Sequence, residues 1–83
     1  DWLEDQVIAI YAGVSGRLDK VDIGDVGRYE REVLQFMRSA HPELCERVLN
    51  ERQDSTSRLN AGLAQALDQA FDEFENRVWR ASN

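Results

Sequence analysis

Apolar residues recur at intervals of three and four along most of this chain, the spacing that places side chains on one face of an α-helix. The clearest run covers positions 26–40, and a second begins at position 59. Their apolar members are Val26, Tyr29, Val33, Phe36, Met37 and Ala40, and then Leu59, Leu63, Ala66, Leu67, Ala70, Phe71, Phe74 and Val78. No segment alternates apolar and polar residues in the β-branched pattern of a strand. The sequence therefore predicts an all-α fold.

Glycine and acidic residues mark the ends of the first two helices. Apolar residues between positions 3 and 11 predict a first short helix, which we expect to stop at Gly13 in the left-handed conformation. Residues 13–21 then form a connection. We expect Asp22 to cap the second helix, with Asp25 in its first turn, where a carboxylate suits the helix dipole.

The only proline, Pro42, separates the second helical run from a shorter one. Proline disfavours the helical conformation at His41 and suits the first turn of a new helix. The apolar side of that new segment is Leu44, Cys45, Val48 and Leu49. Residues 50–57 are polar, and residues 54–57 offer several caps for the last helix. We expect a small helical bundle of three main helices plus a shorter one, as a single domain over residues 1–83.

Size and charge narrow the classes of partner. A domain of about this length buries only about 60% of its unfolded surface, so we expect it to depend on a partner or to be part of a longer protein. Sixteen acidic and ten basic residues give a net charge of −6, which disfavours nucleic acid and anionic membrane surfaces. No apolar run approaches the roughly 20 residues that cross a bilayer. A protein or a small ligand is the expected partner.

Gly13 and Gly16 enclose a Gly-Val-Ser-Gly segment that invites comparison with phosphate-binding loops. A P-loop requires Gly-x-x-x-x-Gly-Lys-Ser/Thr after a strand, whereas this segment follows a predicted helix and lacks the lysine. The Gly-x-x-Gly clamp of RNA-binding modules requires strands and a basic surround. A helix stop followed by a turn is the favoured interpretation.

His41 and Cys45 are four positions apart and could share a helix face, where a histidine can activate a thiolate. No third residue orients such a pair, Pro42 lies between them, and a zinc site would lack two ligands. Cys45 is more simply a small buried apolar residue, and a single cysteine excludes an internal disulfide.

The last helix carries four carboxylates, Asp68, Asp72, Glu73 and Glu75. They lack the ligand order of an EF-hand and the Glu-x-x-His pairing of di-iron bundles, so a solvated outer face is the favoured interpretation. Trp2 and Trp79, near the two ends, either close the core or lie on a docking surface, since aromatic residues anchor protein interfaces. The sequence leaves both alternatives open.

Residues 6–19 read Gln-Val-Ile-Ala-Ile-Tyr-Ala-Gly-Val-Ser-Gly-Arg-Leu-Asp. This stretch resembles the C-terminal helical domain of the alpha subunit of F-type ATP synthase, where Gln-apolar-apolar-x-Ile-Tyr-Ala-Gly-x-x-Gly-x-Leu-Asp is a hallmark. The resemblance continues through residues 25–32 and 34–44. Residues 55–78 match in pattern and position.

The resemblance implies a mechanical role. In that family the alpha subunit alternates with the catalytic beta subunit around a central stalk, gamma, and its C-terminal domain lies at the membrane-facing end of the ring. The site for ATP and Mg lies mostly in a central domain that is outside these residues. The resemblance therefore implies a structural, positioning domain of a regulatory subunit, in an enzyme complex that couples ATP synthesis to ion translocation. It also implies a peripheral complex on the cytoplasmic side of a bacterial inner membrane, or the organelle equivalent.

We accordingly expect no catalytic, cofactor-binding or metal-binding residue in this chain. We expect Gly13 and Gly16 to form a structural turn, and the core to include Tyr11, Leu18, Tyr29, Phe36, Leu63, Leu67, Phe71 and Phe74. The alternative is an independent helical adaptor that binds a partner helix in a groove. An enzyme built around His41 and Cys45 is a third interpretation.

Overall fold

The computed structural model describes residues 2–51 and 61–82, apart from the side chains of residues 2–4 and 51. Every secondary-structure element that the structure describes is a helix. In order along the chain these are α1 (Trp2–Val14), the 3-10 turns η1 (Arg17–Lys20) and η2 (Ile23–Asp25), α2 (Val26–Ala40), α3 (Pro42–Glu51) and α4 (Ala61–Arg77). This confirms the predicted all-α fold of three main helices plus a shorter one. The caps expected at residues 54–57, and Leu59, lie outside the described residues.

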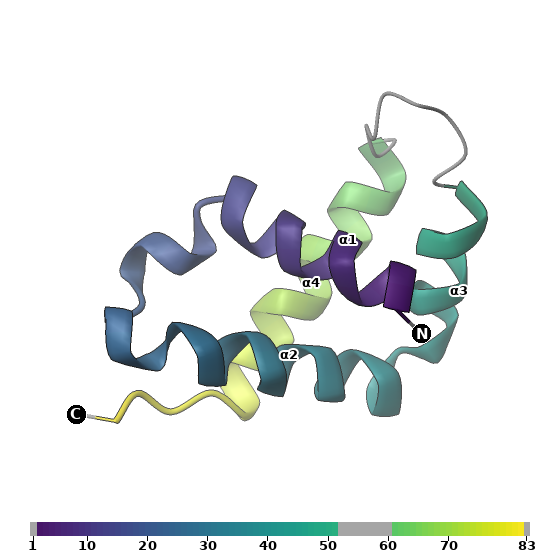
Figure 1. The fold of residues 1–83 in the computed structure, drawn as a ribbon. Coiled ribbons are helices and arrows are strands. Elements are labelled where there is room, and N and C mark those ends of the chain that lie inside the picture. The colour runs from purple at the N-terminus through teal and green to yellow at the C-terminus, as the bar shows by residue number, and fades with distance from the viewer. Residues whose placement is uncertain (1, 52–60, 83) are drawn as a thin grey trace.

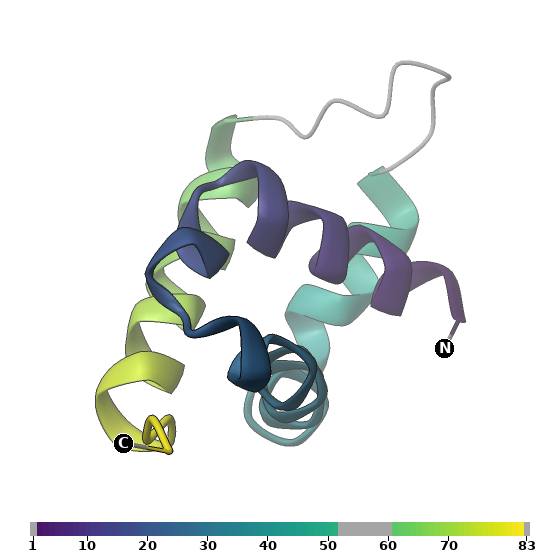
Figure 2. The same cartoon turned by 60° about the vertical axis from the view of Figure 1, so that its left-hand side comes forward.

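The helices surround a common apolar interior. In Figure 2, which looks nearly along α2, α4 and α3 stand on opposite sides and α1 crosses above them. Figure 1 shows from the side how α4 crosses α1 and α2. The buried cluster draws on every helix: Ile8 and Ala12 from α1, Tyr29, Val33 and Met37 from α2, Leu44, Cys45 and Val48 from α3, and Leu63, Leu67, Ala70, Phe71 and Phe74 from α4.

The residues expected in the core occupy two environments. Tyr29, Leu63, Leu67, Phe71 and Phe74 are buried, whereas Tyr11, Leu18 and Phe36 are partly buried against the cluster. Phe71 and Phe74 of α4 lie between the other aromatic rings. Phe71 meets Tyr11 edge-on at 5.9 Å between ring centroids, and Phe74 meets Tyr29 edge-on at 5.2 Å. Edge-on pairs of this kind add to the stabilisation that burial alone provides.

The first helix ends later than the sequence suggests. α1 continues through Gly13 to Val14, and the Ser15 N–H donates to the Tyr11 carbonyl at 2.9 Å. Among the glycines that the structure describes, only Gly16 has a positive φ, of 84°. The expected left-handed stop at Gly13 is therefore wrong, and Gly16 holds that conformation. Two glycines three positions apart have the same conformational freedom, so the pattern alone cannot choose between them.

The second helix also begins later than expected. Asp22 precedes η2, and its side chain makes no capping hydrogen bond there. α2 starts at Val26, with Asp25 at its N-cap, again without a side-chain cap bond. The reason is tertiary, because the Asp25 carboxylate instead accepts hydrogen bonds from the backbone N–H and the hydroxyl of Ser82. The expectation that Asp22 caps this helix is therefore wrong.

α2 and α3 separate at the only proline, as predicted. α2 ends at Ala40, and Pro42 is the first residue of α3. The His41 N–H still donates to the Met37 carbonyl at 2.9 Å, so the last turn of α2 closes on the junction residue. At the end of the chain α4 stops at Arg77, and Val78, expected on the apolar stripe, lies just beyond it with 43% of its surface exposed.

Candidate functional site: an arginine-centred network

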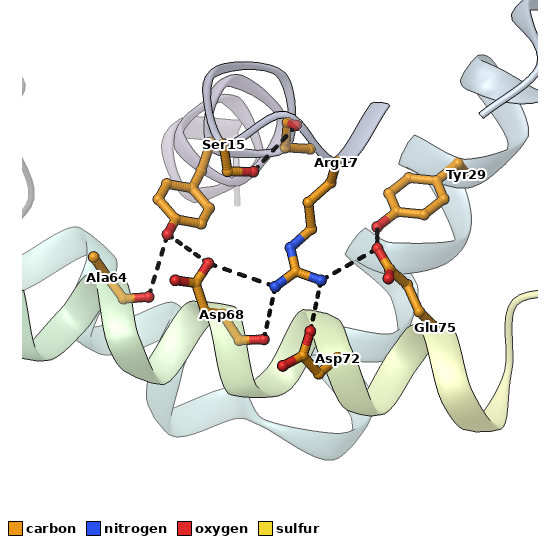
Figure 3. A network of polar contacts seen from close by, with 9 residues as sticks. Ser15, Arg17, Tyr29, Ala64, Asp68, Asp72 and Glu75 are labelled. Carbon is orange, nitrogen blue, oxygen red and sulfur yellow. Dashed lines mark hydrogen bonds and ion pairs between the residues drawn. The ribbon is translucent and has the colours of Figure 1, made fainter. Parts of the chain in front are cut away.

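Three carboxylates form a row on one face of α4, and a single guanidinium group lies against them. Asp68, Asp72 and Glu75 follow one another at intervals of four and three residues, so they share a helix face. The Arg17 nitrogens lie 2.8 Å from Asp72, 3.3 Å from Glu75 and 3.6 Å from Asp68 (Figure 3). Arg17 also donates to the backbone carbonyl of Asp68 at 3.2 Å. We call Arg17, the three carboxylates and the two tyrosines that bind them, Tyr11 and Tyr29, the Arg17 network.

The turn that follows α1 places Arg17 over α4. Gly16 turns the chain in its left-handed conformation, and η1 begins at the next residue. The turn is closed by the Gly16 N–H, which donates to the Gly13 carbonyl at 3.2 Å. The guanidinium carbon then lies over the Phe71 ring, 5.4 Å from its centroid, which allows a cation–π interaction. Only 14% of the Arg17 side chain is exposed, whereas 63% of its partner Asp72 is.

Two tyrosines extend the network to α1 and α2. The Tyr11 hydroxyl donates to Asp68 Oδ1 at 2.6 Å and has a longer contact of 3.3 Å with the Ala64 carbonyl. The Tyr29 hydroxyl donates to Glu75 Oε2 at 2.5 Å. Figure 3 shows the Tyr29 hydroxyl pointing at Glu75, next to the Arg17 guanidinium. The network therefore joins three helices and the turn through one face of α4.

The environment keeps both phenols protonated. Burial, followed by the hydrogen bond to Asp68, raises the pKa of Tyr11 to about 12. Burial, followed by the hydrogen bond to Glu75, raises the pKa of Tyr29 further. For Arg17, burial favours the neutral form, but hydrogen bonds with Asp72 and Glu75 outweigh it and raise the pKa. At neutral pH both tyrosines therefore keep the proton that they donate, and Arg17 stays a cation.

This arrangement suits a structural role, in which it holds segments of the chain together, better than catalysis. The donors and acceptors of the network are paired directly with one another. Arg17 and the three carboxylates border an open hollow of about 450 Å³, whose lining also includes Ser15, Gly16 and Lys20. Within residues 2–51 and 61–82, no group of three or more His, Cys, Asp or Glu side chains is arranged to hold a metal ion. The paired guanidinium has little capacity left for a further anion.

Comparison with known proteins identifies the family. The family model described as the ATP synthase alpha/beta chain, C terminal domain, matches residues 2–74. The chain belongs to this family. It is similar to ATP synthase subunit alpha of Kineococcus radiotolerans, with 34% identity over 73 residues that cover 88% of this chain and 12% of the relative. The chain thus spans only a small part of that relative's length. A comparison with solved structures found no match.

Most of the Arg17 network lies within the stretch that matches the ATP synthase C-terminal domain family. Arg17, Asp68 and Asp72 lie within residues 2–74, and Glu75 lies one residue beyond it. Among the described residues, no helix of this domain is long and apolar enough to cross a membrane.

The network corrects in part the interpretation of the α4 carboxylates as a solvated face. Asp68 and Asp72 do face solvent, with 47% and 63% of their side chains exposed. Glu75 has only 21% of its side chain exposed, and Glu73 lies 2.8 Å from His41, so these two are held inside the domain. Sequence reasoning also missed Arg17 as a functional candidate. The sequence carries a signal for the carboxylate row only, because like charges at helical spacing are stabilised by a nearby cation, but it does not indicate which cation.

His41 and Cys45 do not form a catalytic pair in this domain. Cys45 is buried in the core, at 5% exposure. His41 Nε2 lies 2.8 Å from Glu73, and Nδ1 lies 3.3 Å from Glu43. Because carboxylates engage both ring nitrogens, neither is available as a base for a thiol. The hydrogen bond to Glu73 raises the pKa of His41. The ring therefore links the α2–α3 junction to α4 through this carboxylate.

Trp79 packs inward in this domain. Its ring meets Tyr29 edge-on at 5.1 Å between centroids and lies 6.2 Å from Phe74. The Arg28 guanidinium covers its other side, 4.2 Å from the ring centroid. Of the two alternatives left open by the sequence, the structure supports core closure for Trp79. The Trp2 side chain lies outside the described residues.

Proposed function

We propose that this chain is the C-terminal helical part of an alpha-type ATP synthase subunit and serves there as a packing and positioning domain. The match to the family model over residues 2–74 supports the placement in the complex. The 34% identity with a protein named ATP synthase subunit alpha supports alpha rather than beta. The nucleotide chemistry, with ATP and Mg, belongs under this proposal to a central domain of the longer subunit.

The Arg17 network is the observation that carries the positioning role. Its charged groups pair with one another and connect the turn after α1 to α4. Tyr11 and Tyr29 connect α1 and α2 to the same face of α4. A body tied in this way has few low-cost local openings, so it can hold its outer surfaces in fixed relation. Such a body suits a subunit that must keep its place while a neighbouring stalk turns.

The partners under this proposal are the beta subunit and the central stalk gamma. Exposed apolar side chains offer contact surface, because Ile10 and Val14 lie one helical turn apart on α1 with 64% and 76% of their surfaces exposed. The complex would be peripheral, on the cytoplasmic side of a bacterial inner membrane. The same exposed pair favours the second candidate, a stand-alone adaptor with a single helical partner.

A chimera tests the proposal directly. The segment of the Kineococcus alpha subunit that matches this chain is replaced by the chain, and the subunit is expressed with the other subunits of that complex. We expect the ring to assemble, by native mass spectrometry, and to keep ATP hydrolysis coupled to the stalk. The same graft placed in the beta subunit should assemble poorly, which separates alpha from beta.

Matched arginine variants sharpen the chimera experiment. Arg17→Ala should reduce assembly. Arg77→Ala should not, because the Arg77 side chain is 76% exposed and, among the described residues, pairs only with Glu73, at 3.4 Å. A chimera that remains helical by circular dichroism yet never assembles would contradict the alpha assignment and favour the adaptor.

A further inference from the structure

The segment that follows α4 folds back onto α2 instead of leaving the domain. The N–H groups of Val78 and Trp79 both donate to the Phe74 carbonyl at 2.9 Å, which ends α4 and turns the chain. Figure 1 shows the yellow tail running from the end of α4 beneath the first half of α2. This segment lies beyond residues 2–74, the stretch shared with the family model.

Trp79 is the first anchor of the tail. Its indole ring packs against Tyr29 and Phe74, and the Arg28 guanidinium covers it at 4.2 Å from the ring centroid. Tyr29 is 1% exposed and Phe74 is fully buried with the tail in this position. The indole therefore covers the end of the aromatic interior between α2 and α4.

Ser82 is the second anchor, three positions later. Its backbone N–H and its hydroxyl both donate to Asp25 Oδ2, at 3.2 and 3.1 Å. Asp25 is 6% exposed and lies 3.6 Å from Arg28. Arg28 in turn donates to the Arg80 carbonyl at 2.8 Å, between the two anchors. One buried carboxylate and one guanidinium thus bind both the backbone and a side chain of the tail.

We propose that residues 79–82 form a strap that docks, within the same chain, on a site made by Asp25, Arg28 and Tyr29. The strap closes the aromatic interior between the N-terminal end of α2 and the C-terminal end of α4. The site accepts an extended segment with an aromatic residue followed three positions later by a residue that donates from both its N–H and its hydroxyl. This inference does not depend on the subunit to which the domain belongs.

Two readouts test the strap on the full chain. In a Trp2→Phe background Trp79 is the only tryptophan, so its emission and its quenching by acrylamide report on docking. Trypsin cleavage after Arg80 reports on release of the backbone. We expect cleavage at Arg80 to be at least roughly tenfold slower than in an unstructured peptide of the same local sequence, because a docked segment must first open locally.

Substitutions at Ser82 weaken docking of the strap in two steps and lie outside the helices. Ser82→Ala removes one of the two donors to Asp25 and should speed cleavage at Arg80 about threefold. Ser82→Pro removes both donors, since proline has no N–H, and should speed it about tenfold. Ser39→Ala is the matched control, because that hydroxyl donates only to backbone carbonyls of its own helix, at Gln35 and Phe36. It should leave cleavage at Arg80 unchanged.

Three outcomes would overturn the strap. One is cleavage after Arg80 that is as fast in the Trp2→Phe chain as in the unstructured peptide, with Trp79 emission quenched by acrylamide as strongly as in that peptide. A second is equal cleavage in the Ser82 variants and the Ser39 control. The third is protection that rises with protein concentration together with a dimer in light scattering, which would assign the site to the tail of a second copy.

Discussion

The hydroxyl of Tyr29 lies 2.5 Å from a carboxylate oxygen of Glu75, which also lies 3.3 Å from Arg17. The ring that carries this hydroxyl is buried against Phe74 and Trp79. Tyr29 is therefore the residue at which the apolar interior and the Arg17 network meet. Glu75 has little exposure, so its hydrogen bonds are stronger than they would be in water.

Tyr29→Phe isolates the polar half of this residue. The substitution keeps the ring and its edge-on contacts but removes the donor to Glu75, so we expect the free energy of unfolding to fall by about 1 kcal/mol. Urea unfolding followed by circular dichroism measures it. A double-mutant cycle with Glu75→Ala, which removes the acceptor, is the control, because the two effects should be clearly non-additive. Simple additivity would show that the hydrogen bond contributes nothing.

Arg17→Ala should destabilise the domain more than any exposed arginine does. It leaves a row of three carboxylates facing one another and removes the cover of Phe71, so we expect a loss of roughly 1–3 kcal/mol. Arg77→Ala should cost less than about 0.5 kcal/mol, since exposed helix pairs contribute little. Denaturant unfolding of both variants at low and high salt compares them. Equal losses for the two arginines would remove the special role of Arg17.

The two glycines of the first turn should respond in opposite directions. Gly16→Ala places a side chain at φ 84°, and we expect a loss of about 1–2 kcal/mol. Gly13 lies in α1 and a Cβ there would meet nothing within 4 Å, so Gly13→Ala should stabilise the domain by about 0.5–1 kcal/mol. Thermal unfolding measures both shifts. A stabilising alanine at residue 16 would contradict the assigned turn.

His41 should make stability depend on pH near neutrality. The hydrogen bond to Glu73 raises the pKa of His41 above its unfolded value of about 6.5, so folding favours the protonated ring. Its contribution is therefore complete below about pH 6.5 and is lost as the pH rises through the folded pKa. Urea unfolding at pH 5 to 9 should show this decline. His41 is the only histidine, so a His41→Gln variant should flatten the profile, and an unchanged profile would contradict the pairing.

Local pattern was enough to predict the helices but not their tertiary partners. Apolar spacing predicted α2 and α4, and Pro42 predicted the break before α3, because both signals act within a turn or two of helix. The choice between Gly13 and Gly16 was beyond the pattern, since both glycines permit a left-handed turn. The start of α2 was misjudged because the Asp25 carboxylate is bound by Ser82, from the other end of the chain.

The Arg17 network could be predicted only in part for the same physical reason. The row of α4 carboxylates is visible in the sequence, but the cation that neutralises it is about fifty positions away. No local rule selects Arg17 over the other arginines. Trp79 likewise stayed undecided, because an aromatic residue near a chain end serves a core and an interface equally well.

The long spans of the network also bear on how the chain folds. Tyr11 and Asp68 are separated by 57 positions, and Tyr29 and Glu75 by 46, so these bonds form only after distant segments meet. Closing such loops has an entropic cost that α2 and α3, joined by one residue, do not have. We expect α2 and α3 to associate before the transition state and the carboxylate row to gain its cation after it. Loss of Arg17 would then speed unfolding more than it slows refolding.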